Sequence, residues 1–143
     1  MKKLPEALIL LAALATPALA APAKSVTISD GWFRALPAGL PAGRYFKIRN
    51  GGQKDLAVTG AASPACGMLM LHQSENKGGM SGMAMVESVH LPAGKSASFS
   101  PGGFHLMCMD AKLKVGGQVP VTIRLSDGSA VTASFAVKDA KGR

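Results

Sequence analysis

The sequence is poor in aromatic residues, in charged residues and in cysteine. Aromatic residues make up 5% and charged residues 17% of the 143 residues, and the two cysteines are Cys66 and Cys108. The formal net charge is +8, but the basic residues are spread along the chain and few aromatics accompany them, which argues against a nucleic-acid-binding protein. A hydrophobic content of 48% also excludes a disordered tail. The composition therefore predicts one modest folded core.

Long apolar runs are absent beyond the first residues. Residues 1–20 have the order of a secretory signal, with Lys2-Lys3, an apolar run over residues 7–15, and small residues ending at Ala20. No later run approaches the roughly 18 apolar residues of a membrane span. We expect residues 1–20 to be a signal peptide cleaved near Ala20. Residues 21–143 are then one soluble periplasmic domain with no membrane span and no cysteine for a lipid anchor.

Helical periodicity is also lacking, because Gly 17 and Pro 9 interrupt the chain too often for helices of ordinary length. Short alternating or β-branched runs lie between turn residues instead, which is typical of an all-β antiparallel sandwich or small barrel. The expected strands are 25–29, 31–35, 44–49, 56–62, 67–73, 83–90, 95–100, 103–109, 118–126 and 130–137.

The sequence leaves the redox state of the two cysteines open. An oxidising compartment permits a disulfide between Cys66 and Cys108. Two small buried thiols are the alternative, since free cysteine also packs as an apolar residue. Their spacing alone does not decide between these states.

Methionine and histidine, by contrast, are concentrated. Apart from Met1, every methionine and histidine lies between Met68 and Met109. Residues two apart in a strand share a face, so His105 and Met107 project together, opposite Leu106. The same parity separates another set from the core: Met68, Met70 and His72.

Thioether sulfur and imidazole nitrogen are the ligand types that suit Cu(I). Mg²⁺ and Ca²⁺ prefer oxygen ligands, and zinc sites use Cys, His and carboxylates. Thioethers also form no disulfides, so they remain ligands in an oxidising compartment. Methionine equally fills cores and apolar interfaces, which is the simpler explanation of a methionine-rich stretch. His90 has the other parity from Met83, and we expect it to be an ordinary surface residue.

The spacing resembles a known family. Ten residues separate His72 from Met83, twenty-one separate Met83 from His105, and one separates His105 from Met107. This H-x10-M-x21-H-x-M pattern resembles that of the periplasmic copper chaperone family PCuA(C). Flanking segments over about 25–137 resemble it too: Gly31-Trp-Phe-Arg34, Tyr45-Phe-Lys-Ile-Arg-Asn50, Leu91-Pro-Ala-Gly94 and Pro101-Gly-Gly-Phe-His-Leu-Met107.

The resemblance implies a cupredoxin-like antiparallel β-sandwich with Greek-key topology that is not an enzyme. It implies one Cu(I) per chain in a shallow, partly exposed site, delivered for assembly of the binuclear copper centre of cytochrome c oxidase. Its partners would be the oxidase subunit that holds this centre or a Sco-type thioredoxin-like copper protein, and we expect a monomer. The expected ligands are His72, Met83, His105 and Met107. The methionines expected to surround them are Met70, Met80, Met85 and Met109.

Some features depart from the family pattern. Cys66 and Cys108 replace small or apolar residues, and the segment 109–114 is short. The end of the chain has no His- and Met-rich tail, so we expect no Cu(II) site there.

A blue-copper electron carrier is disfavoured because no histidine follows Cys108. A copper monooxygenase with an N-terminal histidine ligand is disfavoured because Ala21 would begin the mature chain. A copper storage or tolerance protein without an oxidase client remains the alternative.

Overall fold

The computed structural model describes residues 19–37 and 40–143, so most of the expected signal peptide, residues 1–18, lies outside the described residues. The described part contains strands and no helix, and hence no helix that could span a membrane. The strands are β1 (Val26–Arg34), β2 (Ala42–Asn50), β3 (Leu56–Ala62), β4 (Met68–Lys77), β5 (Met80–Met85), β6 (Val89–Leu91), β7 (Ser96–Phe99), β8 (Phe104–Met109), β9 (Gln118–Leu125) and β10 (Ala130–Lys138).

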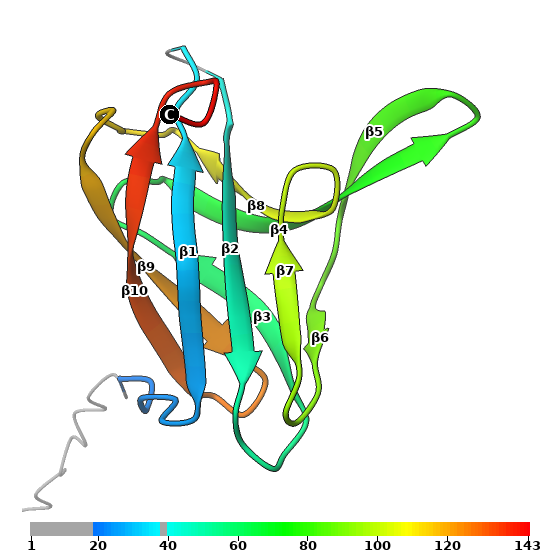
Figure 1. The fold of residues 1–143 in the computed structure, drawn as a ribbon, viewed down its shortest axis with the longest axis vertical. Coiled ribbons are helices and arrows are strands. Elements are labelled where there is room, and N and C mark those ends of the chain that lie inside the picture. Colours follow the sequence, from blue (N-terminus) through cyan, green and yellow to red (C-terminus); the bar gives the residue numbers. More distant parts are fainter. Residues whose placement is uncertain (1–18, 38–39) are drawn as a thin grey trace, which may run out of the picture.

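The strands form a β-sandwich in which one hydrogen-bonded sheet wraps around the core (Figure 1). The order is β5-β4-β8-β2-β1-β10-β9-β3-β6, β7 pairs with β2, and β3 also pairs with β4. The predicted all-β sandwich is therefore confirmed. One pairing departs from the antiparallel prediction, because β1 and β10 run parallel.

Aromatic side chains fill the space between the layers. Phe46 stacks on Phe99 with ring centroids 4.3 Å apart, and Phe33 meets Phe135 edge to face at 5.7 Å. All four rings are buried in one cluster with aliphatic residues from both layers. This core supports the inner faces of β4 and β8, whose outer faces carry Met68, Met70, His72, His105, Met107 and Met109.

Two strand boundaries differ from the predicted ones. The two expected strands 25–29 and 31–35 are replaced by a single strand, β1 (Val26–Arg34), which is interrupted by an irregularity at Asp30 with φ 55°. The expected strand 83–90 is divided into β5 and β6, while the preceding strand extends to Lys77. The reason is a tight turn at Gly78 and Gly79, where φ is 60° and 79°. These left-handed conformations favour a two-residue hairpin over a longer loop.

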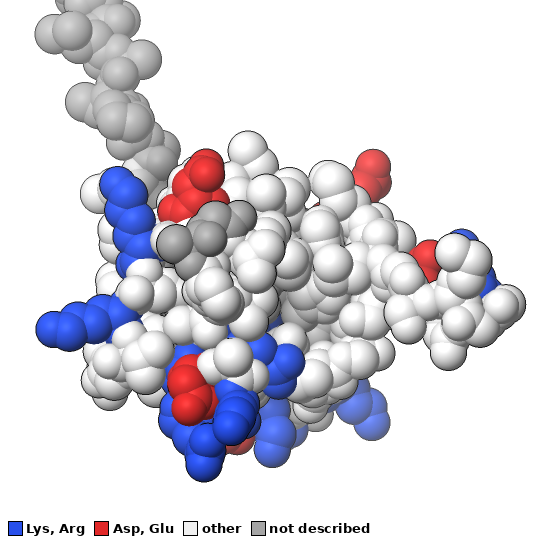
Figure 2. All heavy atoms as spheres, turned by 90° about the horizontal axis from the view of Figure 1, so that it is seen from above, with Lys and Arg blue, Asp and Glu red and all other residues white. Residues whose placement is uncertain are grey.

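The β4–β5 hairpin extends away from the sandwich (Figure 1). The charged residues of this hairpin are Glu75 and Lys77, and they form an ion pair at 3.2 Å. The hairpin is therefore almost uncharged. Seen from above, basic side chains gather along one side of the molecule, whereas the projecting hairpin is largely uncharged (Figure 2). The hairpin therefore offers a mostly neutral surface, rich in methionine.

The structure joins Cys66 and Cys108 in a disulfide bond. Beside it lies Arg44, which is completely buried and has no carboxylate partner among the described residues. Its guanidinium lies 3.5 Å from the Phe33 ring centroid, donates to the carbonyl of Ala42 at 2.6 Å, and donates to the Cys66 sulfur at 3.1 Å. Burial lowers the pKa of Arg44 to about 9, so the guanidinium stays charged at neutral pH.

Candidate metal centre

The pairing of β4 with β8 brings the predicted ligands to one face. His72 lies opposite His105, and Met70 lies opposite Met107. Directly opposed residues of antiparallel strands project to the same side. The residues between them are buried in the core, as strand parity predicts: Leu69, Leu71, Leu106 and Cys108.

The third element of the site is β5, which folds back along β4. Its register places Met85 opposite His72 and Met83 opposite Ser74. The sulfur of Met83 reaches to 3.2 Å from Nε2 of His105. The β4–β5 hairpin and the more distant strand β8 thus supply the four predicted ligands to one side of the sheet.

A backbone carbonyl determines which nitrogen of His105 is free. Nδ1 lies 3.1 Å from the carbonyl oxygen of Gly103, and because that oxygen can only accept, Nδ1 carries the proton and donates. In the neutral ring, Nε2 then directs its lone pair toward the Met83 sulfur. Two donors about 2.0 and 2.3 Å from a tetrahedral ion would lie about 3.5 Å apart. The 3.2 Å separation is close to that value.

His72 is the second imidazole of the group. Both of its ring nitrogens are buried and have no hydrogen-bond partner. Buried polar atoms nearly always have a partner, so two orphaned nitrogens in one ring point to a ligand. Its ring centroid lies 5.8 Å from that of His105, with the planes at 80°. Burial, and then the charge of His105, lower the pKa of His72, which favours the neutral form that binds metals.

The site is open on one side only. His105 and Met107 are 4% and 8% exposed, whereas Met83 is 59% exposed. Among the predicted ligands, Met83 is therefore exposed and the two β8 residues are buried.

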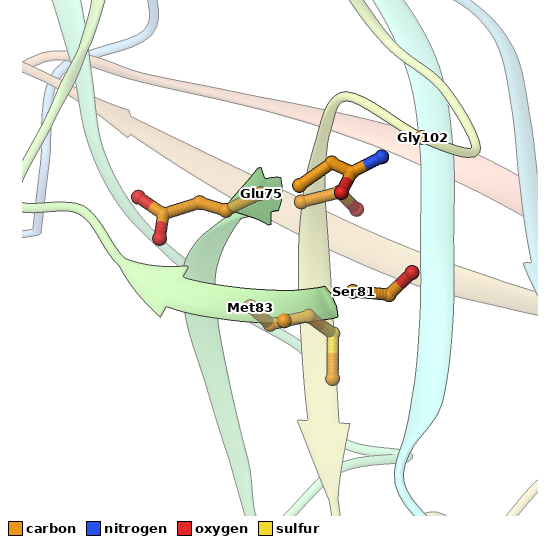
Figure 3. Close-up of a pocket in the computed structure, with 7 residues that line it drawn as sticks. Glu75, Ser81, Met83 and Gly102 are labelled. Carbon is orange, nitrogen blue, oxygen red and sulfur yellow. The ribbon is translucent and has the colours of Figure 1, made fainter. Parts of the chain in front are cut away.

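A pocket of about 480 Å³ lies beside Met83. It is formed by the β4–β5 hairpin and the turn before β8 (Figure 3). Apart from Met83, polar residues and glycines line it: Ser74, Glu75, Asn76, Ser81, Gly82 and Gly102. Solvent, or the side chain of another protein, can therefore reach the exposed sulfur from this pocket.

The four surrounding methionines are not equivalent. Met70, Met85 and Met109 project to the same face as the histidines, by their pairing with Met107, His72 and Met68 respectively. Met80 does not, because it pairs with Lys77 on the other side of the hairpin and is 76% exposed. His90 is exposed on β6, the strand at the opposite end of the sheet order from the hairpin.

Two groups at this face are not among the ligands and surrounding methionines expected from the sequence. Met68 joins the same face opposite Met109, and the Gly103 carbonyl orients His105. The alternating parity of β4 is a signal for Met68, but no sequence signal identifies the carbonyl.

Within residues 19–37 and 40–143, no group of three or more His, Cys, Asp or Glu residues could hold a metal ion. The donor set at this face is therefore neutral nitrogen and thioether sulfur, which suits a soft monovalent ion such as Cu(I).

Comparison with known proteins places the chain in a family. A protein-family model described as "Putative lipoprotein LpqE-like" matches residues 26–137. The chain belongs to the LpqE-like family. This LpqE-like protein is 36% identical over 123 residues to a protein of Leifsonia xyli subsp. xyli named "Putative lipoprotein Lxx21020", a match that covers 84% of the chain and 74% of that protein.

Solved structures agree with the fold. The solution structure of the Cu(I) form of DR1885 from Deinococcus radiodurans is 30% identical to the LpqE-like protein, with a TM-score of 0.61 and coverage of 85% and 81% of the two chains. The copper-bound PCuAC domain from PmoF2 is 21% identical, with a TM-score of 0.66 and coverage of 80% and 93%. The LpqE-like protein thus has the fold of PCuAC domains, as its sequence resemblance implied.

Proposed function

We propose that this LpqE-like protein is a copper chaperone that binds one Cu(I) at the site of His72, Met83, His105 and Met107. The observation that carries the proposal is the approach of the Met83 sulfur to Nε2 of His105, with the proton of that imidazole held on the other nitrogen. The orphaned nitrogens of His72 supply a further donor at the same place. The copper-bound forms of the two similar structures support the choice of metal.

The difference in burial suggests how an ion is released. Four neutral donors leave the charge of Cu(I) in place, so no countercharge has to be removed during transfer. The exposed thioether of Met83 is the donor that an incoming ligand displaces first, through the adjoining pocket. The buried His105 holds the ion until the new bond is made. Transfer by ligand exchange makes and breaks metal–ligand bonds only, and no substrate is chemically converted.

The client we propose is the binuclear copper centre of cytochrome c oxidase, reached directly or through a Sco-type thioredoxin-like protein. Residues 1–20 direct export, and residues 21–143 form the periplasmic carrier, which acts as a monomer. The neutral, methionine-rich hairpin beside the site suits contact with a second soft-metal site, and the positive net charge suits an acidic partner.

The metal site is tested by competition for Cu(I) with a chelator of known affinity. We expect His105→Ala to lower the affinity by about a hundredfold or more and Met83→Leu by about tenfold, because a buried imidazole and an exposed thioether are removed. The control is Met80→Leu, which removes a methionine of the same hairpin on its other side. Unchanged affinity in both site variants would refute the assignment.

The client is tested separately in cells. In a strain that lacks the gene, cytochrome c oxidase activity at limiting copper should fall and should return with the wild-type gene but not with the His105→Ala form. Normal oxidase activity together with increased copper sensitivity would instead identify a storage or tolerance protein.

A further inference from the structure

A second group of soft ligands continues along the same face of β4 and β8. Beyond the paired histidines, Met70 faces Met107, and Met68 faces Met109. We name these four residues the thioether ladder. Opposed residues have Cβ atoms about 5 Å apart, and successive pairs on one face are about 7 Å apart along the strands. Long, flexible methionine side chains at these separations can bring their sulfurs to a common ion.

Packing does not account for the outer end of the ladder. Met68 is 57% exposed, while Leu69 and Cys108, on the inner side of the same strands, already fill the core. A methionine side chain that lies opposite another methionine but is largely in water contributes little to stability. Exposure falls along the ladder, since Met70 and Met109 are half-buried and Met107 is 8% exposed.

We infer that Met68, Met70 and Met109 form a second Cu(I) site, next to the site of His72 and His105. The inference rests on the proposed function, because it assumes that the first site binds copper. Three neutral thioethers select Cu(I) over harder cations. Without an imidazole, this site binds more weakly than the first. Its exposed end at Met68 is a second place, besides Met83, where copper enters or leaves, and Met107, which faces Met70, links it to the first site.

The number of bound ions tests this inference. The wild-type exported protein is titrated with Cu(I) under anaerobic conditions, at protein concentrations high enough to fill a weak site, and the bound copper is counted after rapid gel filtration. We expect two equivalents. The triple variant Met68→Leu, Met70→Leu, Met109→Leu should bind one, while His105→Ala with Met83→Leu should lose the tighter equivalent and keep the weaker one. Met80→Leu, at a 76% exposed methionine outside the ladder, is the control and should bind two.

A second measurement does not depend on the triple variant folding. With Ag(I) as a redox-inert probe, the methyl resonance of Met83 should shift during the first equivalent, and those of Met68 and Met109 during the second. Met68→Leu alone, at an exposed position, should weaken only the second step.

The outcomes separate the two proposals. If wild type binds one equivalent, or if the ladder variant still binds two, the second site does not exist, whatever the first site does. If instead the tighter equivalent survives in the His105→Ala, Met83→Leu variant, the assignment of the first site fails and the second site, which rests on it, falls too.

Discussion

His72 and His105 are direct cross-strand partners on β4 and β8, with ring centroids 5.8 Å apart and ring planes at 80°. This proximity disfavours a positive charge on His72. Burial, and then the charge of His105, lower the pKa of His72 from its ordinary 6.5. A proton is therefore bound more readily by the unfolded chain than by the folded protein.

The first prediction concerns the stability of the copper-free protein at acid pH. Since unfolding takes up a proton at His72, the free energy of unfolding should decrease as pH falls from about 6.5 toward the lowered pKa of the folded state, and should be independent of this group above pH 6.5. Thermal unfolding of wild type and His72→Gln between pH 5 and 8 measures the effect. The variant should show a shallower decline at acid pH. Parallel profiles would show that His72 titrates normally.

The second prediction concerns the turn that brings Met83 to the site. Gly79 has φ 79° and open space around the position of a Cβ atom. Gly79→Ala should cost about 1 kcal/mol through backbone strain alone. It should also weaken Cu(I) binding several-fold, because the strain displaces β5. Gly82→Ala is a matched control, since Gly82 also has open space but no positive φ. Equal copper affinities for the two variants would contradict the role of the turn.

The third prediction concerns the buried Arg44. Its charge has no carboxylate partner among the described residues, so Met, of similar length and apolar, should be tolerated or should stabilise the protein by about 1 kcal/mol. Arg44→Ala should instead destabilise it by about 3 kcal/mol, because it leaves a cavity beside Phe33. Denaturant unfolding of both variants gives the comparison. A large loss of stability in Arg44→Met would show that the charge itself is required.

The fourth prediction concerns the disulfide. Cys66 and Cys108 are 42 positions apart, and opening a loop of this size should lower the free energy of unfolding by about 3–4 kcal/mol. The double variant Cys66→Ala, Cys108→Ala should still bind Cu(I) with nearly wild-type affinity, because Cys108 points into the core, away from the ligands. Mass measurement after alkylation without reductant should show no modified cysteine in wild type.

Some of the site could be predicted from local properties of the chain. Strand parity is set by the alternation of side chains, so the separation of His105 and Met107 from Leu106 was predictable without knowing the fold. The register between β4 and β8 was not, because it depends on a core closed by residues from both layers. Met80 was expected to surround the ligands because only the β4–β5 register shows that it lies on the other face. Met68, by contrast, could be placed by its parity with Met70 and His72.

The sequence by itself determined the types of donor, the spacing that resembles PCuA(C), the all-β class and the identity of the two cysteines. These are properties of composition and of neighbouring residues. Only the tertiary structure decided that the cysteines pair, that His105 holds its proton toward Gly103, and that Met83 faces the free nitrogen. It also decided that the β8 ligands are buried while Met83 stays exposed. The disulfide and the approach of Met83 to His105 depend on segments that are far apart in sequence and are brought together by strand pairing, which no local pattern encodes.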